Sequence, residues 1–205
     1  GVLAIANLRG GSEYGEEWHR AGMLDKKQNV FDDLIAAAEY LIEQQYVDPK
    51  RLAIHGRSNG GLLVGAAMTQ RPDLFRAVIC GVPLLDMVRY HRFRMARLWI
   101  SEYGSAENAD DFEWLHAYSP YHRVRDGESY PATLIYTGAS DSRVDPLHAR
   151  KMAARLQAAN GSRHPIVLRV ETGAGHGRGK PLSKTVEEWT DIWSFAFDQL
   201  GVEYR

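Results

Sequence analysis

The sequence contains a single cysteine and no long apolar run. One cysteine excludes an intrachain disulfide and any metal site built from several thiolates. Cys80 lies in the apolar run Ala77-Val78-Ile79-Cys80, which predicts a small buried side chain rather than a reactive thiol. No stretch reaches the roughly 18 apolar residues that a membrane-spanning helix needs. We therefore expect neither a metal or other cofactor nor a membrane partner.

An excess of charge of either sign is also lacking. The chain carries 25 Lys and Arg against 26 Asp and Glu, a formal net charge of −1. Proteins that bind nucleic acid show a basic excess or stripe, so no nucleic-acid partner is expected. The composition is compatible with a cytoplasmic or a periplasmic protein. With 44% hydrophobic residues, 205 residues are enough for one domain with a buried core.

The N-terminal residues lack the features of a secretory leader. No basic segment precedes the apolar residues 1–5, as a signal peptide requires. The sequence starts without methionine inside this apolar run, and we expect further residues upstream in the natural protein.

Short apolar segments alternate with helical patterns along the chain. We predict strands at residues 2–6, 51–55, 77–82, 133–137 and 166–170, and helices at residues 29–45, 62–70, 109–117, 146–159 and 183–200. Asn29 is the predicted cap of the first helix, with Asp32 and Asp33 in its first turn. This alternation is typical of an α/β fold, a mostly parallel sheet with helices on both faces. No repeat or linker interrupts residues 1–205, which indicates one domain.

A candidate nucleophile follows the second predicted strand. Gly56-Arg57-Ser58-Asn59-Gly60 fits the pattern G-x-S-x-G, with a strand directly before it and a helix directly after it. In this setting a tight turn lifts the Ser58 hydroxyl above the sheet edge, and the Asn59 backbone N–H can stabilise an oxyanion. The alternative, a glycine-rich turn that only joins strand to helix, is less consistent with this context.

A serine nucleophile needs a base and an acid that orients the base. Of the histidines beyond the fourth predicted strand, His164 precedes the fifth strand, at the wrong sheet edge, whereas His176 follows it in a glycine-rich loop. Asp141 and Asp145 both follow the fourth strand, but capping of the next helix accounts for Asp145. The order Ser, Asp, His therefore predicts a catalytic triad of Ser58, Asp141 and His176.

At this point the sequence resembles the prolyl oligopeptidases, serine peptidases that cut short peptides after proline. The shared segments include Asn7-Leu8-Arg9-Gly10-Gly11-Ser12-Glu13-Tyr14-Gly15, Lys27-Gln28-Asn29-Val30-Phe31-Asp32-Asp33, the nucleophile motif with Gly61, Trp99-Ile100-Ser101-Glu102-Tyr103-Gly104, Tyr118-Ser119-Pro120-Tyr121 and Gly173-Ala174-Gly175-His176-Gly177. The resemblance implies the C-terminal part of an α/β-hydrolase catalytic domain whose N-terminal strands are missing, with Asp141 and His176 again as the family's acid and base.

The resemblance also implies a substrate pocket. Trp99 matches the tryptophan that stacks on the substrate proline, Tyr103 and Val144 match further pocket walls, and Arg143 matches the arginine that binds a substrate carbonyl. Ordinary core packing is the alternative for the two aromatic residues. A surface ion pair with Asp145 is the alternative for Arg143.

Two positions depart from the family pattern, and part of the family's site lies outside this sequence. Arg57 stands where relatives commonly have glycine, and Ser140 and Ser142 flank Asp141 where relatives often have His and Asp. The family's second oxyanion donor, a tyrosine hydroxyl, and its β-propeller belong to segments not present here. We expect this chain alone to be weakly active or inactive.

The sequence thus favours a serine endopeptidase that cleaves after proline through an acyl-enzyme. Related alternatives are an oligopeptidase for basic residues or an aminopeptidase, although no acidic cluster lies near Trp99. A carboxylesterase agrees less well, because the shared segments extend beyond the catalytic motifs. From a different class, the chain could act as a non-catalytic interaction module.

Overall fold

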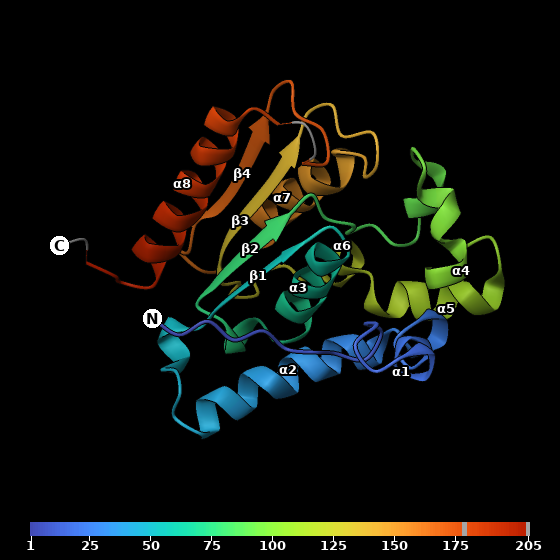
Figure 1. The fold of residues 1–205 in the computed structure, drawn as a ribbon, viewed down its shortest axis with the longest axis horizontal. Coiled ribbons are helices and arrows are strands. Elements are labelled where there is room, and N and C mark those ends of the chain that lie inside the picture. Colours follow the sequence, from blue (N-terminus) through green and yellow to red (C-terminus); the bar gives the residue numbers. More distant parts are fainter. Residues whose placement is uncertain (178–179, 204–205) are drawn as a thin grey trace.

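A four-stranded parallel sheet forms the centre of the computed structural model, which describes residues 1–177 and 180–203. Its strands, β1 (Ala53–Arg57), β2 (Ala77–Gly81), β3 (Ala132–Gly138) and β4 (Ile166–Glu171), lie side by side in chain order (Figure 1). The four strands predicted beyond residue 50 are confirmed, with ends shifted by at most two residues.

The fifth predicted strand, at residues 2–6, is wrong. These residues form no regular structure, and Val2, Leu3 and Ile5 are 78%, 83% and 84% exposed. A strand needs a neighbouring backbone to take up its hydrogen bonds. Within the described residues β1 pairs only with β2, and no strand is placed beside residues 2–6. Among the described residues this apolar segment therefore has no strand partner.

Helices cover both faces of the sheet, as predicted. On one face α3 (Asn59–Gln70) and α7 (Leu147–Ala159) contact the strands, and α2 (Gln28–Glu43) packs on α3. On the other face α8 (Leu182–Gln199) packs through Ile192 and Ala196 against a small apolar cluster of Ile79, Leu134 and Tyr136. Figure 1 shows α8 on the side of the sheet opposite α3 and α7.

The burial of the strands follows from this layering. Every residue of β2 and β3 is buried, and both strands are almost continuously apolar, as expected when helices cover both faces. Helix α2 instead presents one apolar stripe at helical spacing, formed by Phe31, Leu34, Ile35, Ala38 and Ile42.

The start of α2 differs from the sequence prediction. Gln28 is the first helical residue and Lys27 precedes it, so Asn29 lies inside the helix and does not cap it. Its side-chain amide instead donates to the Ala21 carbonyl at 2.8 Å. Asp33, beyond the first turn, accepts from the Arg9 backbone N–H at 2.9 Å. Local propensity predicted a helix cap at Asn29. In the structure the Asn29 and Asp33 side chains instead hold the N-terminal loop against α2.

Short helices and 3-10 turns lie in the connections between the longer elements. They are α1 (Glu16–Arg20), α4 (Ile100–Tyr103), α5 (Ala109–Tyr118), α6 (Pro120–Arg123) and the 3-10 turns Leu24–Lys26, Pro49–Arg51, Pro72–Leu74, Tyr90–Arg92 and Ala96–Trp99. Both α4 and α5 contact the turn Leu24–Lys26, which directly precedes α2. This packing brings residues near position 100 beside residues near position 27.

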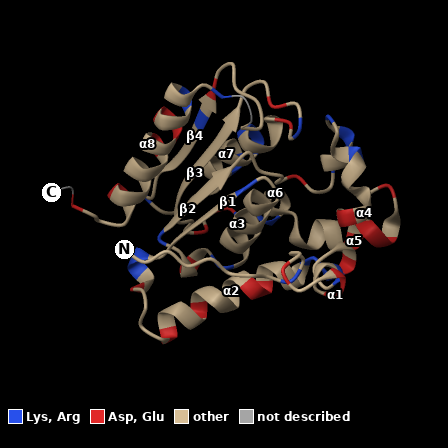
Figure 2. Cartoon of the chain, in the orientation of Figure 1, with Lys and Arg blue, Asp and Glu red and all other residues tan. Residues whose placement is uncertain are grey.

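The surface carries both signs of charge. Figure 2 shows basic and acidic residues interspersed over the described helices and loops, in agreement with the near-zero net charge. Among the described residues, no helix combines the length and apolar character needed to span a membrane.

Candidate active site

Three of the predicted site residues follow the carboxyl ends of strands. Ser58 comes directly after β1, Asp141 follows β3, and His176 follows β4. Because parallel strands end at the same edge of a sheet, these loops meet there. There the His176 side chain lies within hydrogen-bond distance of both Asp141 and Ser58.

The turn that carries Ser58 is tight. Ser58 has a φ of 58°, in the left-handed region that non-glycine residues rarely adopt. A Cβ on Gly56 would lie 2.0 Å from the Gly60 carbonyl oxygen, so only glycine fits this close approach. The Ser58 N–H donates to the Gly81 carbonyl at 2.8 Å, which ties the turn to β2.

A hydrogen-bond chain links the three side chains. His176 Nδ1 lies 2.7 Å from Asp141 Oδ2, and His176 Nε2 lies 3.0 Å from Ser58 Oγ. An ionised carboxylate only accepts, so Nδ1 carries the proton and Nε2 is left to accept from the Ser58 hydroxyl. In this tautomer the imidazole can take the serine proton as Ser58 attacks.

Asp141 is held in its charged form. The residue is fully buried, and its Oδ1 accepts from the backbone N–H groups of Arg143 and Val144, each at 2.9 Å. Burial alone disfavours the carboxylate, but the bonds from His176 and from these backbone groups outweigh burial and lower the pKa of Asp141. The acid therefore stays ionised and keeps the imidazole oriented.

The two loops that carry the acid and the base approach each other closely. A Cβ on Gly138 would lie 2.4 Å from the Ala174 carbonyl oxygen, and Ser140 N donates to that same oxygen at 3.0 Å. Glycine at position 138 thus allows the loop after β4 to pack on the loop after β3.

Asn59 is the first residue of α3 and directly follows Ser58. Its backbone N–H has no carbonyl one helical turn earlier to accept it, and the helix N-terminus favours negative charge. The group therefore has the position and polarity to receive an oxyanion that develops beside Ser58 Oγ.

The four predicted pocket residues lie beside the triad. Trp99, Tyr103 and Val144 belong to one apolar cluster, and the Arg143 guanidinium carbon lies 5.4 Å from the centre of the Trp99 ring. Asp145 contacts other groups instead: it accepts from the Leu147 N–H at the start of α7 and from Arg94 Nε, both at 3.0 Å. The hydrogen bond to the first turn of α7 thus accounts for Asp145. The ion pair between Arg143 and Asp145 is not formed.

Two contacts near the pocket were not predicted from the sequence. The Tyr103 hydroxyl donates to Asn59 Oδ1 at 2.9 Å, and Lys27 Nζ lies 2.9 Å from Glu102 Oε1. Lys27 lies in a shared segment, but no motif signals its role because its partner lies 75 residues away. The packing of α4 against the turn Leu24–Lys26 brings them together.

Arg57, the departure next to the nucleophile, reaches the loop of the candidate base. Its Nη2 donates to the His176 carbonyl at 3.3 Å, and the residue is exposed. A Cβ on Gly177 would lie 2.7 Å from the same Nη2 atom.

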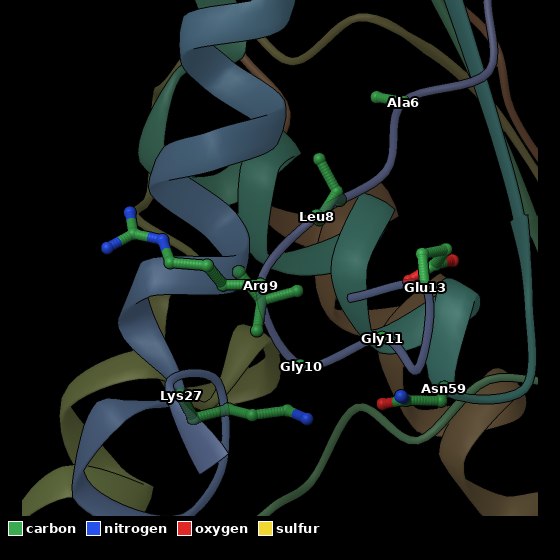
Figure 3. A pocket seen from close by; sticks show the side chains of 9 residues that line it. Ala6, Leu8, Arg9, Gly10, Gly11, Glu13, Lys27 and Asn59 are labelled. Carbon is green, nitrogen blue, oxygen red and sulfur yellow. The ribbon is translucent and has the colours of Figure 1, made fainter. Parts of the chain in front are cut away.

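Among the described residues, no group of three or more His, Cys, Asp or Glu is arranged to hold a metal ion. Cys80 is buried as predicted, and its thiol donates to the Gly61 carbonyl at 3.3 Å. A cavity of about 180 Å³ lies beside Asn59, and the Gly10-Gly11 backbone and Lys27 also line it (Figure 3).

Comparison with known proteins identifies the relatives of this chain. The model of the prolyl oligopeptidase family matches residues 1–203. A prolyl endopeptidase of Elizabethkingia miricola is 47% identical over 204 residues, which are 99% of this chain and 29% of the relative. A prolyl endopeptidase of Dictyostelium discoideum is 46% identical over 206 residues, 99% of this chain and 27% of the relative.

Solved structures agree with the sequence comparison. One from a structural and mechanistic analysis of two prolyl endopeptidases is 60% identical with a TM-score of 0.94, and the match covers 96% of this chain and 29% of that one. A post-proline cleaving enzyme from Rickettsia typhi is 37% identical with a TM-score of 0.93, over 97% and 28% of the two chains.

These comparisons confirm the predicted α/β-hydrolase class and the resemblance. The chain spans less than a third of the length of these relatives. Because the family model matches almost every residue, the chain belongs to the prolyl oligopeptidase family.

Proposed function

We propose that this chain carries the catalytic centre of a serine endopeptidase that cleaves peptides after proline. The observation that carries the proposal is the hydrogen-bond chain from Asp141 through His176 to Ser58, directly beside the aromatic residues Trp99 and Tyr103. A nucleophile, its base and a flat apolar surface are what hydrolysis at a proline residue requires.

In the proposed reaction Ser58 Oγ attacks the carbonyl carbon of the substrate proline while His176 Nε2 takes the hydroxyl proton. Asp141 stabilises the imidazolium, and the Asn59 N–H receives the oxyanion. The tetrahedral intermediate collapses as the peptide C–N bond breaks, and His176 donates its proton to the departing amine. Water, deprotonated by His176, then hydrolyses the ester and regenerates Ser58.

The geometry around Trp99 supports proline specificity. The indole offers a flat face for a pyrrolidine ring, and the exposed Arg143 guanidinium beside it can donate to a carbonyl upstream in the substrate. Glu102 is the acidic residue nearest to Trp99 in sequence, and Lys27 and His19 already bind its carboxylate. It is therefore not available to bind a basic substrate side chain.

The proposal includes residues outside this chain. We infer that residues 1–205 form one catalytic unit, the C-terminal part of a longer peptidase, because the relatives are more than three times as long. In the full-length protein an N-terminal segment would supply the second oxyanion donor, and a β-propeller would restrict access to short peptides. Loss of one oxyanion donor costs about 10²- to 10³-fold in kcat, so the isolated chain is expected to be weakly active.

Labelling with a fluorophosphonate probe tests the proposed nucleophile. We expect a covalent adduct at Ser58 in the full-length protein, loss of the adduct and of peptide hydrolysis in Ser58→Ala, and no change in Ser129→Ala, which alters an exposed serine in another loop. Unchanged labelling of Ser58→Ala would overturn the assignment and favour a different nucleophile.

A further inference from the structure

A buried lysine that the proposed mechanism does not use lies behind the pocket. The Lys27 side chain is only 2% exposed, and its ammonium group lies 2.9 Å from Glu102 Oε1. Burial lowers the pKa of Lys27, while the Glu102 carboxylate opposes this change. Burial of a charged pair is costly, so its contribution to stability alone does not explain its presence.

The Glu102 carboxylate has a second partner, the imidazole of His19. His19 Nε2, from α1, lies 2.9 Å from Glu102 Oε2. The Glu102 carboxylate therefore joins α4 to α1 and to the residue that precedes α2, which lie 83 and 75 residues earlier in the sequence. This arrangement fixes the position of α4, on which Tyr103 is the next residue.

Lys27 also contacts Tyr103 directly. Its Nζ lies 4.9 Å from the centre of the Tyr103 ring, within the range of a cation–π interaction. The Tyr103 hydroxyl in turn donates to Asn59 Oδ1 at 2.9 Å. A continuous path of contacts thus leads from the buried ion pair to the residue whose backbone N–H faces the developing oxyanion.

The cavity beside Asn59 shows why such a path is needed. It is an open pocket of about 180 Å³, and Asn59 is exposed beside it, so this side of Asn59 lacks close packing. Figure 3 shows the Lys27 and Asn59 side chains pointing toward the same part of the cavity, below the Gly10-Gly11 backbone. Where packing does not fix a side chain, polar contacts must, and the Tyr103 hydroxyl is the described contact of the Asn59 amide oxygen.

We propose that Lys27, paired with Glu102, is a positioning residue for the catalytic site. The pair sets the orientation of the Tyr103 phenol, and through the Tyr103 hydroxyl it fixes Asn59 and the oxyanion donor. This inference rests on the proposed function, since it assigns the same pocket and the same donor.

The test is a double-mutant cycle in the full-length protein. The variant Lys27→Met/Glu102→Gln removes both charges, so neither charge is left without its partner. The variant is prepared in two backgrounds, the wild-type protein and Tyr103→Phe. In the wild-type background we expect kcat/KM for a Gly-Pro reporter peptide to fall about tenfold, mainly through kcat. In the Tyr103→Phe background we expect a change of less than about twofold, because the hydroxyl path is already absent.

A matched control removes an ion pair away from the pocket. Arg71 Nη1 and Glu39 Oε1 lie 2.5 Å apart beyond the C-terminal end of α3. Arg71→Met/Glu39→Gln is expected to change kcat/KM by less than about twofold. If Lys27→Met/Glu102→Gln does not fold, Glu102→Gln alone keeps an acceptor for Lys27 Nζ and serves in the same cycle, with an expected loss of about threefold in the wild-type background only.

The outcomes separate this inference from the proposed function. Equal losses in both backgrounds, or no loss in either, would overturn the positioning role even if the enzyme cleaves after proline. The rate of Ser58 labelling by a fluorophosphonate gives a second readout, because the phosphoryl oxygen uses the same donor but not the proline pocket. Slower labelling of the Lys27→Met/Glu102→Gln variant supports the inference even if the full-length protein prefers another residue, and unchanged labelling contradicts it.

Discussion

At the scale of single residues, the site depends on backbone strain as much as on side-chain chemistry. Ser58 holds a left-handed φ of 58°, a conformation that costs about 1–3 kcal/mol for a non-glycine residue. The hydrogen bond from Ser58 N to Gly81 and the start of α3 at Asn59 keep it there. This strain lifts the hydroxyl to the sheet edge, where His176 reaches it.

The state of Asp141 gives a first prediction. Asp141→Asn preserves the size of the side chain but offers the histidine an amide that can donate, which favours the wrong imidazole tautomer. We expect kcat to fall by about 10³- to 10⁴-fold while the protein remains folded. Steady-state kinetics with circular dichroism checks this, and a loss of less than tenfold would argue against Asp141 as the orienting acid.

The lowered pKa of Asp141 also makes the stability of the fold depend on pH. The unfolded carboxyl titrates near its ordinary pKa of about 3.9, whereas the folded carboxyl titrates lower. The stabilisation from its bonds is therefore fully present above about pH 4 and is lost as pH falls through the lowered folded value. Between pH 5 and 8 this group is not expected to limit activity.

Arg57 gives a second prediction at this scale. Its bond to the His176 carbonyl is long, at 3.3 Å, and exposed to solvent, so it adds little net free energy. We expect Arg57→Gly to change kcat/KM by less than about threefold, measured on a Gly-Pro reporter. A tenfold loss would show that this residue holds the His176 loop in place.

Residue order and the family motifs were enough to predict the positions of Ser58, Asp141 and His176, because parallel strands end at one edge. They were not enough to predict the role of Lys27. Its burial arises where α4 packs against the turn Leu24–Lys26 and brings Glu102 to Lys27, whereas a lysine is usually exposed.

At the scale of elements, α7 is joined to the loop after β2 by a buried histidine. His148 Nδ1 accepts from the backbone N–H groups of Leu85 and Asp86, at 3.4 and 3.1 Å. Burial lowers the pKa of His148 to about 4, while Asp86 and Asp145 oppose this change. The histidine is therefore neutral in the folded protein over most of the acidic range.

The lowered pKa of His148 predicts a loss of stability in acid. The unfolded histidine binds a proton near pH 6.5, whereas the folded one does not until about pH 4. Stability thus falls as pH drops from about 6.5 to about 4, by about 3 kcal/mol from this group. His148→Asn keeps an acceptor at the Nδ1 position but cannot titrate, so urea unfolding at several pH values should show a flatter dependence. An unchanged slope would contradict the assignment.

The elements that sequence patterns predicted well are those that pack on both sides. Strands β2 and β3 were predicted from short, mostly apolar segments, and every residue of both is buried. The prediction failed at residues 2–6 and at Asn29 for one reason. Apolar composition and capping propensity are local signals, whereas pairing with a neighbouring strand and contact with Ala21 depend on the rest of the fold.

At the scale of the whole molecule, one face of α8 carries an apolar stripe of large side chains. Its members are Leu182, Val186, Trp189, Trp193 and Phe197, which are 78%, 56%, 38%, 49% and 44% exposed. The edge of β1 lies nearby, because the Trp189 and His55 rings are 5.8 Å apart. An apolar stripe next to an open strand edge promotes association.

We therefore predict that the isolated 205-residue chain self-associates. Trp193→Lys/Phe197→Glu places charges on the stripe without touching the buried residues Ile192 and Ala196. In light scattering coupled to size exclusion, the unmodified chain should form larger species at about 100 µM and the variant should shift toward monomer. An unmodified chain that remains monomeric at this concentration would contradict the prediction.

The central claim is that this site cleaves after proline, and one measurement tests it most directly. The full-length protein is assayed for kcat/KM on matched Gly-Pro and Gly-Arg reporter peptides, with Trp99→Ala alongside. The account predicts a preference for proline of about 100-fold or more, most of it lost in Trp99→Ala, because the indole face provides the apolar contact. Preference for arginine, or equal rates on both peptides, would contradict it.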